Sequence, residues 1–390
     1  MRYSTPSLHP PVLTTDEDES LFRSRAVRPA SLRKFQVARL ADVVQSVSIP
    51  LTTVSRAGSF DAYVNISFPG AGGTLSPDLL VDSGSNCLIL PDYSALSGLP
   101  GFAQNYKVLE YDILEPWKCP ACKLRGPIRI PTSNTDFYDI PDCIFYACTG
   151  PNEKNQRTAN FGSGCLGPRQ LDSETVQSPI ALSPDYPYAE FNYAPAHQIF
   201  EPGLGWISIG NSFLTLYKAI PDGYQMLEII PNQPWMSLRP KKLIIAGKET
   251  EWPGALAASS IAMVDTGGGP VFLSDPEKYL WADDWPASAP LPSWIGDSFA
   301  CQATSADLSI TLSDDKGREF SYQVQTAKLP PLAQGLTLVM CRLCSFMEND
   351  SEGKPQNGMN IGGLSALFNY VLIDYVNARV GLKAKPPALV

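Results

Sequence analysis

The stretch "LLVDSGSNCLIL" (residues 79–90) places one carboxylate, Asp82, between two aliphatic runs that are typical of buried β-strands. Burying an unpaired charge costs free energy, so a charge in this position needs a compensating partner. The stretch "IAMVDTGGGPVFL" (residues 261–273) repeats the pattern around Asp265, which lies 183 positions later (265 − 82). Because each stretch reads strand, Asp-Ser/Thr-Gly, strand, we predict two related halves with one carboxylate in each.

Each half carries a second repeated feature, a later hydrophobic-Gly segment: "FGSGCLGPR" (residues 161–169) and "GMNIGGLSA" (residues 358–366). A chain of 390 residues also exceeds the size of one typical hydrophobic core, which favours two lobes. We therefore expect a polar leader at residues 1–46, an N-terminal lobe at residues 47–228 and a C-terminal lobe at residues 229–390.

Short β-like runs separated by Gly, Pro, Asn and Asp dominate the sequence after the leader. Helical patterns are few and short, and the best candidate is "GLSALFNYVL" (residues 363–372). With 36 Pro and 29 Gly among these runs, the sequence predicts a mostly β protein with sandwich or barrel-like lobes. Representative runs are "DAYVNISF", "LLVD", "CLIL", "GPIRIP", "GWISIG", "KKLIIAG", "IAMVD", "DLSITLS" and "YVLIDY".

The composition limits the classes of partner. A hydrophobic content of 44% with 18% charged residues is typical of a well-buried globular protein. The formal net charge of −9 and the pI near 4.9 argue against nucleic acid or an anionic membrane surface as a partner. No stretch approaches the length of a transmembrane helix. We expect a monomer whose ligand is a peptide or a small molecule.

The N-terminal stretch "MRYSTPSLHPPVLTTDEDESLFRSR" carries an acidic run and has no apolar core of about 7–15 residues, unlike a secretory signal. As the sequence is written, we therefore expect a cytoplasmic protein. If the N-terminus is incomplete, we expect a secreted one.

Histidine is nearly absent, and this excludes more kinds of catalytic site than the count of any other residue type. The chain contains only His9, in the leader, and His197. Ser-His-Asp catalysis, Cys-His catalysis and most zinc sites would all depend on His197 alone. Carboxylates remain as the candidates for acid-base work.

Nine cysteines include two CxxC pairs, Cys119 with Cys122 and Cys341 with Cys344. Paired CxxC motifs hold structural zinc in many proteins, but these two lie 219 positions apart (341 − 122). We therefore expect no metal and no cofactor. Disulfides remain an alternative, above all between Cys301 and either Cys341 or Cys344, and the cysteines leave the redox compartment open.

The two Asp-Ser/Thr-Gly stretches could form one acid-base site if their carboxylates face each other. Two carboxylates about 3 Å apart do not both ionise readily, so they share a proton, and one stays basic while the other stays acidic. A water molecule held between them is then deprotonated by one carboxylate while the other protonates a substrate carbonyl. This chemistry needs neither histidine nor metal.

The residues after each aspartate suit this geometry. Gly84 and Gly267 permit a tight turn and let backbone N–H groups approach the carboxylates. Ser83 and Thr266 carry hydroxyl groups that are placed to lock the two loops together. Ser85 is placed to bond Asp82 and to help it stay ionised.

At these residues the sequence resembles the pepsin-like aspartic peptidases, with "VDSGS" and "VDTGG" similar to the two active-site motifs of that family. The stretch "NIGGLSALFNYVLIDYVNARVGLK" (residues 360–383) resembles the family's C-terminal segment, which ends in a "D-x-x-N-x-R-[VI]-G" hairpin. "CLG" (residues 165–167) fits the equivalent strand of the first lobe. The resemblance covers about residues 48–385.

The resemblance implies a bilobal fold with two pseudo-symmetric β-barrel-like lobes and a central cleft that holds the substrate. It implies that Asp82 and Asp265 form the catalytic dyad. On the same basis Ser83 and Thr266 brace the dyad, and Ser85 supports Asp82. The Cys301 region also matches a place where the family often has a disulfide.

The sequence departs from the family around the flap, the hairpin that closes over the substrate. Ile89 stands where the family has Trp, and residues 107–131 occupy the place of the hairpin, with Tyr111 as the best candidate for the flap tyrosine. The family's Tyr-Gly-x-Gly pattern is missing there. In the second motif, Gly268 replaces the usual hydroxyl or alanine, so Asp265 loses one possible hydrogen-bond partner.

Three functions follow as alternatives. The first is an aspartic-type endopeptidase that activates water with the shared-proton dyad. The second keeps the fold and the dyad but uses them as general acid and base on a small molecule, in a cyclisation, dehydration or isomerisation of a secondary-metabolite pathway. The third is a non-catalytic binding protein with the same fold.

Overall fold

We analysed a computed structural model of the chain, which divides into residues 1–43 and residues 44–390. The predicted leader, except for Ser46, and two residues singled out from the sequence, Gly268 and Cys344, lie outside the described residues. The structure describes residues 46–56, 59–69, 78–114, 118–133, 136–151, 159–171, 173–194, 197–201, 205–209, 212–233, 236–245, 247–250, 260–267, 271–274, 300–304, 308–324, 338–343, 358–361, 363 and 365–386.

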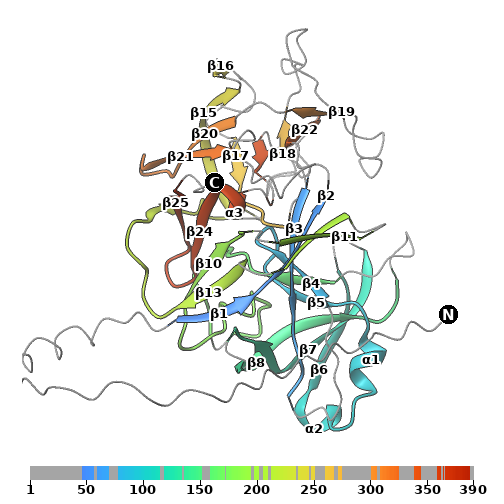
Figure 1. Cartoon of the computed structure of the whole chain (residues 1–390). Helices are drawn as coiled ribbons and strands as arrows, with labels where there is room; N and C mark the ends of the chain where they lie inside the picture. Colours follow the sequence, from blue (N-terminus) through green and yellow to red (C-terminus); the bar gives the residue numbers. More distant parts are fainter. Residues whose placement is uncertain are drawn as a thin grey trace, which may run out of the picture. The chain divides into compact units, whose positions relative to one another are not determined.

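Strands dominate the described residues, as the short β-like runs predict, and the three helices there have only four or five residues each (Figure 1). The strands form three sheets of ten, nine and six strands. No helix in the described part of the chain combines the length and the apolar character that crossing a membrane requires. The helices are α1 (Tyr93–Ser97), α2 (Phe102–Asn105) and α3 (Ser365–Phe368).

The ten-stranded sheet has the strand order β11-β12-β2-β3-β4-β9-β5-β8-β7-β6. Its strands come from the first half of the chain, and the strand that carries Asp82 lies in the middle. They are β2 (Thr52–Arg56), β3 (Ser59–Asn65), β4 (Asp78–Asp82), β5 (Leu88–Leu90), β6 (Lys107–Leu114), β7 (Cys119–Pro131), β8 (Phe137–Cys148), β9 (Asn160–Gly162), β11 (His197–Glu201) and β12 (Gly205–Ile209).

The nine-stranded sheet has the order β19-β22-β18-β23-β17-β15-β20-β21, with β16 paired to β15. Its strands come from the second half of the chain. They are β15 (Ser237–Ile245), β16 (Lys248–Thr250), β17 (Ile261–Met263), β18 (Val271–Ser274), β19 (Ala300–Thr304), β20 (Leu308–Ser313), β21 (Glu319–Val324), β22 (Leu338–Leu343) and β23 (Gly358–Asn360). The backbone register places Cys301 of β19 opposite Cys341 of β22, and the disulfide expected there stays a prediction.

The centre of each sheet repeats one pairing pattern. In the first half β4 runs parallel to β9, β9 antiparallel to β5, and β5 parallel to β8. In the second half β17, β23, β18 and β22 repeat the same sequence of parallel, antiparallel and parallel pairs. Parallel strands covered on both faces are typically continuous hydrophobic runs, which suits "IAM" of β17, where all three residues are buried. The repeat predicted from the two stretches is therefore present in the topology.

The six-stranded sheet takes strands from both halves, in the order β1-β13-β10-β24-β25-β14. Its central pair, β10 and β24, is antiparallel and joins Ala189 to Ile373. Lys385, just after β25, donates from Nζ to the backbone oxygens of Tyr193 and Ala366 and so ties the chain's end to this sheet. The strands are β1 (Ser46–Pro50), β10 (Tyr188–Asn192), β13 (Phe213–Tyr217), β14 (Gln225–Glu228), β24 (Asn369–Asp374) and β25 (Arg379–Ala384).

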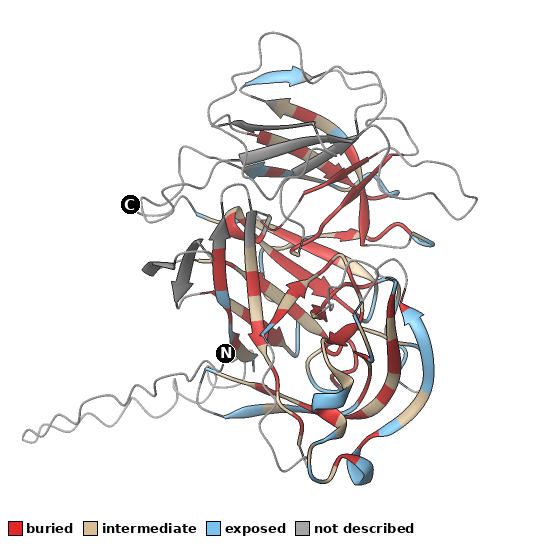
Figure 2. Cartoon of the chain, turned by 90° about the vertical axis from the view of Figure 1, so that its right-hand side faces the viewer, coloured by how far each residue is buried: buried red, intermediate tan, exposed pale blue. Residues whose placement is uncertain are grey.

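The core lies along these strands, where buried residues follow one another (Figure 2). The long strand β7 shows the cause, since Leu124, Ile128 and Ile130 are fully buried. Lys123 and Arg125, on either side of Leu124, form ion pairs on the other face of the strand. Alternation of apolar and charged residues suits a strand with one face on the core.

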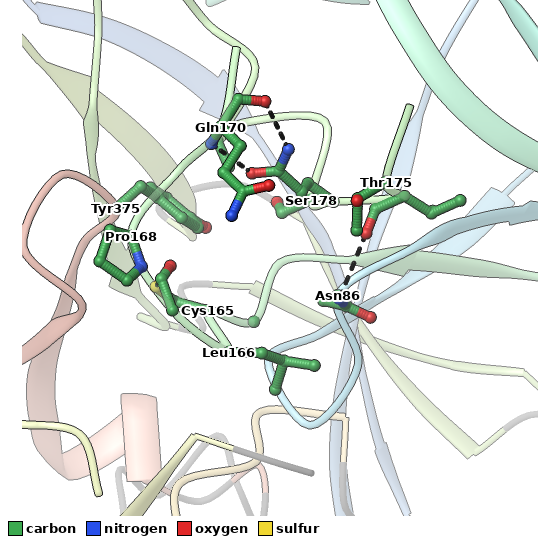
Figure 3. Close-up of a pocket in the computed structure, with 13 residues that line it drawn as sticks. Asn86, Cys165, Leu166, Pro168, Gln170, Thr175, Ser178 and Tyr375 are labelled. Carbon is green, nitrogen blue, oxygen red and sulfur yellow. Dashed lines mark hydrogen bonds between the residues drawn. The ribbon is translucent and has the colours of Figure 1, made fainter. Parts of the chain in front are cut away.

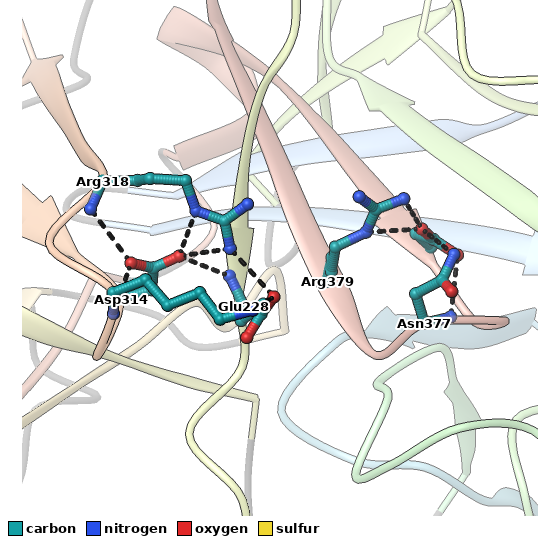
Figure 4. Close-up of polar contacts among 7 residues, drawn as sticks. Glu228, Asp314, Arg318, Asn377 and Arg379 are labelled. Atoms are coloured by element: carbon teal, nitrogen blue, oxygen red, sulfur yellow. Dashed lines mark hydrogen bonds and ion pairs between the residues drawn. The ribbon is translucent and has the colours of Figure 1, made fainter.

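Two buried aspartates organise tight turns (Figure 4). In the β24–β25 hairpin, Asp374 accepts from the N–H groups of Val376 and Asn377, from the Asn377 amide and from the Arg379 guanidinium. This network accounts for the Asp, Asn and Arg of the "D-x-x-N-x-R" signature, and the predicted final hairpin is confirmed. Asp314 holds the turn after β20 in the same way through Arg318.

Two local predictions were wrong. The expected helix at residues 363–372 is only α3, because β24 begins at Asn369 and pairs with β10 and β25. "CLG" at residues 165–167 forms no strand, and the strand parallel to β4 is β9, which ends at Gly162. A Cβ at Gly162 would lie 2.3 Å from the backbone nitrogen of Cys87, so the close approach of the two segments requires glycine there, whereas a Cβ at Gly167 would meet no atom within 4 Å.

Candidate active site

The structure brings the two predicted carboxylates together. Asp82 ends β4, and Asp265 follows β17 at the equivalent position of the second half. A Cβ on Gly84 would lie 2.6 Å from Cγ of Asp265, and a Cβ on Gly267 would lie 2.7 Å from Cγ of Asp82. Each carboxyl group therefore stands against the glycine of the opposite loop, where no larger residue fits. A side-chain hydrogen bond links the two aspartates.

Ser83 and Thr266 connect the two loops by four hydrogen bonds. Ser83 Oγ donates to the Val264 backbone oxygen at 2.9 Å and accepts from the Thr266 backbone N–H at 2.9 Å. Thr266 Oγ1 donates to the Val81 backbone oxygen at 3.1 Å and accepts from the Ser83 backbone N–H at 3.1 Å. Both side chains are buried, so each hydroxyl satisfies polar backbone atoms that water does not reach. The loops thus hold each other in register.

Each carboxylate is also held by donors from its own half. The Gly84 N–H donates to Asp82 Oδ1 at 2.8 Å, and the Gly267 N–H donates to Asp265 Oδ1 at 2.9 Å. These contacts span two residues in both loops, so the two turns have the same local geometry. Backbone N–H groups aimed at a carboxylate favour its ionised form.

Two asparagines complete the site, and the sequence analysis missed both. Asn160 of β9 donates from Nδ2 to Asp82 Oδ2 at 2.8 Å, and Asn360 of β23 donates from Nδ2 to Asp265 Oδ2 at 2.8 Å. Their strands are the parallel neighbours of β4 and β17. The signal was present as a repeated Asn-hydrophobic-Gly, "NFG" at residues 160–162 and "NIG" at residues 360–362. Asn360 gives Asp265 a partner that the glycine at position 268 does not supply.

Ser85 lies one hydrogen bond further from Asp82 than predicted. Its Oγ accepts from Asn160 Nδ2 at 2.9 Å, the same nitrogen that contacts Asp82, and lies 3.9 Å from Cys87 Sγ. Ser85 therefore contacts Asn160, and Asn160 in turn contacts Asp82. The side-chain oxygen of Asn160, Oδ1, is buried and has no hydrogen-bond partner within the described structure.

The environment raises the pKa of Asp82 well above the ordinary value of a carboxyl group. Burial is the main cause, followed by the charge of Asp265 and the hydrogen bond with Asp265, while the donors Asn160 and Gly84 act in the opposite direction. Asp82 therefore retains its proton at a pH where a free aspartate is ionised. A protonated and an ionised carboxyl side by side are the arrangement that acid-base catalysis requires.

The predicted flap tyrosine lies on the outside of the hairpin β6–β7. Tyr111 is 70% exposed, and its side chain hydrogen-bonds to Tyr93 of α1. Its cross-strand partner is Cys122. The contacts described for Tyr111 are therefore with the surface of the first half and not with the two aspartates.

The loop end of the same hairpin is packed into a small hydrophobic cluster. Leu114 at the end of β6 and Cys119 at the start of β7 are buried with Ile89, Ala121 and Cys148. Ile89 stands where the resembling family has Trp, so an aliphatic contact replaces an aromatic one at this point. The hairpin is thus anchored by apolar packing at its outer end.

The cysteines of the first CxxC pair point to opposite sides of β7. Cys119 belongs to the small cluster with Ile89, whereas Cys122 belongs to the main core. Residues three apart in a strand face opposite ways, so these two thiols do not chelate one metal ion. No group of three or more His, Cys, Asp or Glu that would suit a metal occurs among the residues the structure describes.

A pocket of about 250 Å³ lies behind the Asp82 loop (Figure 3). Asn86 and Gly164 form the wall on that side, and Gly164 is bonded to the loop through its N–H to the Ser85 oxygen at 2.7 Å. On the far side Gln170 and Gln177 bond each other twice, at 2.9 and 2.7 Å. Both bonds join the side-chain amide of Gln177 to the backbone of Gln170, so the Gln177 amide already has its partners within the chain.

Comparison with known proteins supports the fold and leaves the activity open. No protein-family model matches the chain. No curated protein matches it either. Among solved structures, the crystal structure of basic 7S globulin from soybean is similar with a TM-score of 0.55 and 12% sequence identity, over 88% of this chain and 95% of that chain. That protein has a pepsin-like fold, so the predicted fold class is confirmed. At this identity the likeness shows the fold alone.

Proposed function

We propose that the chain is an aspartic-type endopeptidase in which Asp82 and Asp265 share one proton and activate a water molecule. The observation that carries the proposal is the contact of the two carboxyl groups across loops that are locked together by Ser83 and Thr266. The ionised carboxylate takes a proton from water as the water attacks the peptide carbonyl, and the protonated carboxyl donates its proton to the carbonyl oxygen.

The proposal includes a peptide substrate bound between the two halves, and a single chain as the working unit. Both carboxylates belong to one chain, so catalysis by this route needs no second subunit. Neither histidine nor a metal takes part in a proton transfer of this kind.

A peptide library tests the proposal. The purified full chain is incubated with peptides of mixed sequence between about pH 3 and about pH 7, and the products are identified by mass spectrometry. We expect cleavage by the unmodified chain and none by Asp82→Asn. Asp185→Asn is the control, because it makes the same change at an exposed position. Cleavage that persists in Asp82→Asn, or no cleavage by a folded unmodified chain, would show that the endopeptidase proposal is wrong.

One observation favours the second candidate, acid-base chemistry on a small molecule. The hairpin β6–β7 is anchored in an apolar cluster through Leu114 and Cys119, and Tyr111 is turned to its outer surface. A peptidase that binds extended chains usually needs a hairpin that opens and closes over them. A fixed hairpin suits a substrate that is small enough to enter from the side.

Metabolite profiling separates the two candidates. In the organism that produces the protein, replacement of the chromosomal copy by Asp82→Asn is compared with Asp185→Asn. Loss of a low-molecular-mass product only in Asp82→Asn, together with no cleavage of the peptide library, favours the small-molecule reaction. Unchanged metabolites and unchanged peptides in both strains would leave a binding protein as the remaining function.

A further inference from the structure

The two asparagines form a matched pair about the dyad. Each is almost fully buried, Asn160 at 4% and Asn360 at 1% exposure, and each comes from the strand parallel to its aspartate's strand. Each Nδ2 lies 2.8 Å from Oδ2 of its aspartate, while a glycine N–H holds Oδ1. Both oxygens of both carboxyl groups therefore have a donor from their own half.

The chemistry of an amide nitrogen sets the consequence. Nδ2 of asparagine donates and does not accept, unlike a serine or threonine hydroxyl. It therefore bonds an ionised carboxylate oxygen well and gives no acceptor to a protonated one. The reverse orientation of the Asn160 amide would place its carbonyl oxygen against both Asp82 Oδ2 and Ser85 Oγ, in place of the nitrogen that bonds both. The buried, unpartnered Asn160 Oδ1 is the cost of the orientation that is present.

We propose that Asn160 and Asn360 are positioning residues that fix the orientation of the two carboxyl groups and favour their ionised forms. The proposal deepens the proposed function, because it concerns the proton balance of the same two aspartates. It also accounts for the second motif, where glycine at position 268 supplies no hydroxyl. Each half supplies its amide from the β-strand beside the aspartate, so the pair acts symmetrically.

Among the described residues, three other titratable groups interact with the charge of Asp82. Asp265 faces it across the two loops, and Cys87 and Tyr193 are the further groups described as interacting with its charge. Burial raises the pKa of Cys87 to about 11 and raises that of Tyr193 above its usual range, with Asp61 a minor contributor to the latter. Both groups are neutral while the carboxyls titrate. A shift in the carboxyl titration therefore reports on the asparagines.

The test follows the carboxyl groups directly and needs no substrate. The full chain is labelled with ¹³C at Cγ of aspartate, and the resonances of Asp82 and Asp265 are identified by their loss in Asp82→Asn and Asp265→Asn. Titration is then compared among the unmodified chain, Asn160→Ala and Asn360→Ala. The matched control is Asn369→Ala, since Asn369 is also a buried amide, and its Nδ2 donates to the backbone oxygen of Gln323 and not to an aspartate.

We expect the titration midpoints of the pair to rise by about one pH unit in either asparagine variant and to stay unchanged in Asn369→Ala. Asn160→Ser, which keeps a smaller donor, should give a smaller rise and serves if Asn160→Ala does not fold. Midpoints that stay the same or fall would overturn the proposal. Because this readout is independent of turnover, it can fail while peptide cleavage is found, or succeed while no substrate is found.

A second inference rests on a separate observation in the hairpin. Sγ of Cys119 and Sγ of Cys148 lie 2.6 Å apart, and both residues are fully buried. Two thiols that are not bonded do not approach this closely, whereas a disulfide joins sulfurs at about 2.0 Å. The strands on either side are already joined, since the Thr149 N–H donates to the Pro120 oxygen at 2.8 Å. A bond between the sulfurs therefore needs only a small side-chain movement.

We infer that Cys119 and Cys148 form a disulfide when the chain meets a disulfide oxidant such as oxidised glutathione. Two thiols give one S–S bond, and their two hydrogens reduce the oxidant to two molecules of glutathione. The bond would fasten the start of β7, next to the tip of the hairpin, to the end of β8. Four further cysteines, Cys87, Cys122, Cys143 and Cys165, are buried as thiols.

Peptide mapping tests this inference. The full chain is treated with oxidised glutathione and then unfolded in denaturant that contains iodoacetamide, which alkylates free thiols, and no reductant. The alkylated chain is then digested. We expect a cross-linked peptide that contains Cys119 and Cys148, two hydrogens lighter than the separate peptides, with Cys122 alkylated in the same sample. Alkylation of both Cys119 and Cys148 would overturn the inference. The Cys119→Ser and Cys122→Ser variants provide the matched comparison, because only the first should remove the cross-link.

Discussion

The two aspartate loops are nearly superimposable in their contacts and differ in their surroundings, and the difference shows where the dyad is asymmetric. Both carboxylates receive a glycine N–H and an asparagine amide. Asp265 is buried, at 8% exposure, whereas Asp82 is half-buried. In the Asp82 loop, Ser85 adds a hydroxyl to the asparagine of its half. The described contacts are thus symmetric, and the two acids differ in how far their side chains are exposed.

The largest effect should come from removing either carboxylate. Asp82→Asn and Asp265→Asn are each expected to lower the rate of peptide hydrolysis by roughly a thousandfold or more, because neither remaining acid has a partner with which to share a proton. The rate constant under single-turnover conditions is the measurement. Equal losses in the two variants would support shared roles despite the different burial. Substantial activity in only one of them would mean that the other aspartate is structural.

The glycines of the two loops should give the next largest effect. Gly84→Ala and Gly267→Ala each introduce a Cβ within 3 Å of the opposite carboxyl group, so the loops must separate. We expect each variant to lose about 2–3 kcal/mol of unfolding free energy, measured by urea denaturation. Gly167→Ala is the control, because a Cβ there meets no atom within 4 Å. Loss of stability in only one of the first two would break the equivalence of the loops.

These two loops also show what the sequence could predict. The Asp-Ser/Thr-Gly repeat identified the carboxylates, their glycines and the two bracing hydroxyls, because all of them lie within a few positions along the chain. Asn160 and Asn360 lie 78 and 95 positions from their aspartates and meet them only through strand pairing. Nothing local in "NFG" or "NIG" indicates that pairing.

The orientation of side chains on the hairpin β6–β7 was harder still to predict from the sequence. Tyr111 was chosen by counting along the chain, but the direction of a side chain on a strand changes with every residue. The tyrosine therefore faces outward on β6, although the hairpin occupies the predicted residues. The final hairpin was predictable because Asp374 bonds partners within five positions of it.

The bracing hydroxyls allow a finer comparison of the loops. Ser83→Ala leaves the Thr266 N–H and the Val264 oxygen without partners, and we expect a loss of about 2 kcal/mol in unfolding free energy. Thr266→Ser keeps the hydroxyl and should lose less than about 1 kcal/mol. A double-mutant cycle of Ser83→Ala with Thr266→Val should show coupling, because the two side chains bond adjacent backbone atoms. Simple additivity would argue that the loops are held by packing instead.

The smallest effect should be a dependence of stability on pH. Because the pKa of Asp82 is raised in the folded chain, the folded state keeps a proton that the unfolded chain releases above about pH 4. The stabilisation from Asp82 is therefore complete below that pH and is lost as the pH rises through the folded pKa. Asp82→Asn removes this loss, so it should melt a few degrees higher than the unmodified chain at neutral pH and equally at pH 3.

Asp314 supplies a control of opposite sign. Burial raises its pKa, but donation from the Glu228 N–H and from Arg318 outweighs burial, and the net pKa is lowered. Its stabilisation is present above about pH 4 and is lost as the pH falls through the folded pKa. Asp314→Asn should therefore melt lower than the unmodified chain at neutral pH, and the difference should shrink in acid. If both variants shifted the melting temperature in the same direction at neutral pH, the raised pKa of Asp82 would be wrong, and with it the proton that the dyad is proposed to share.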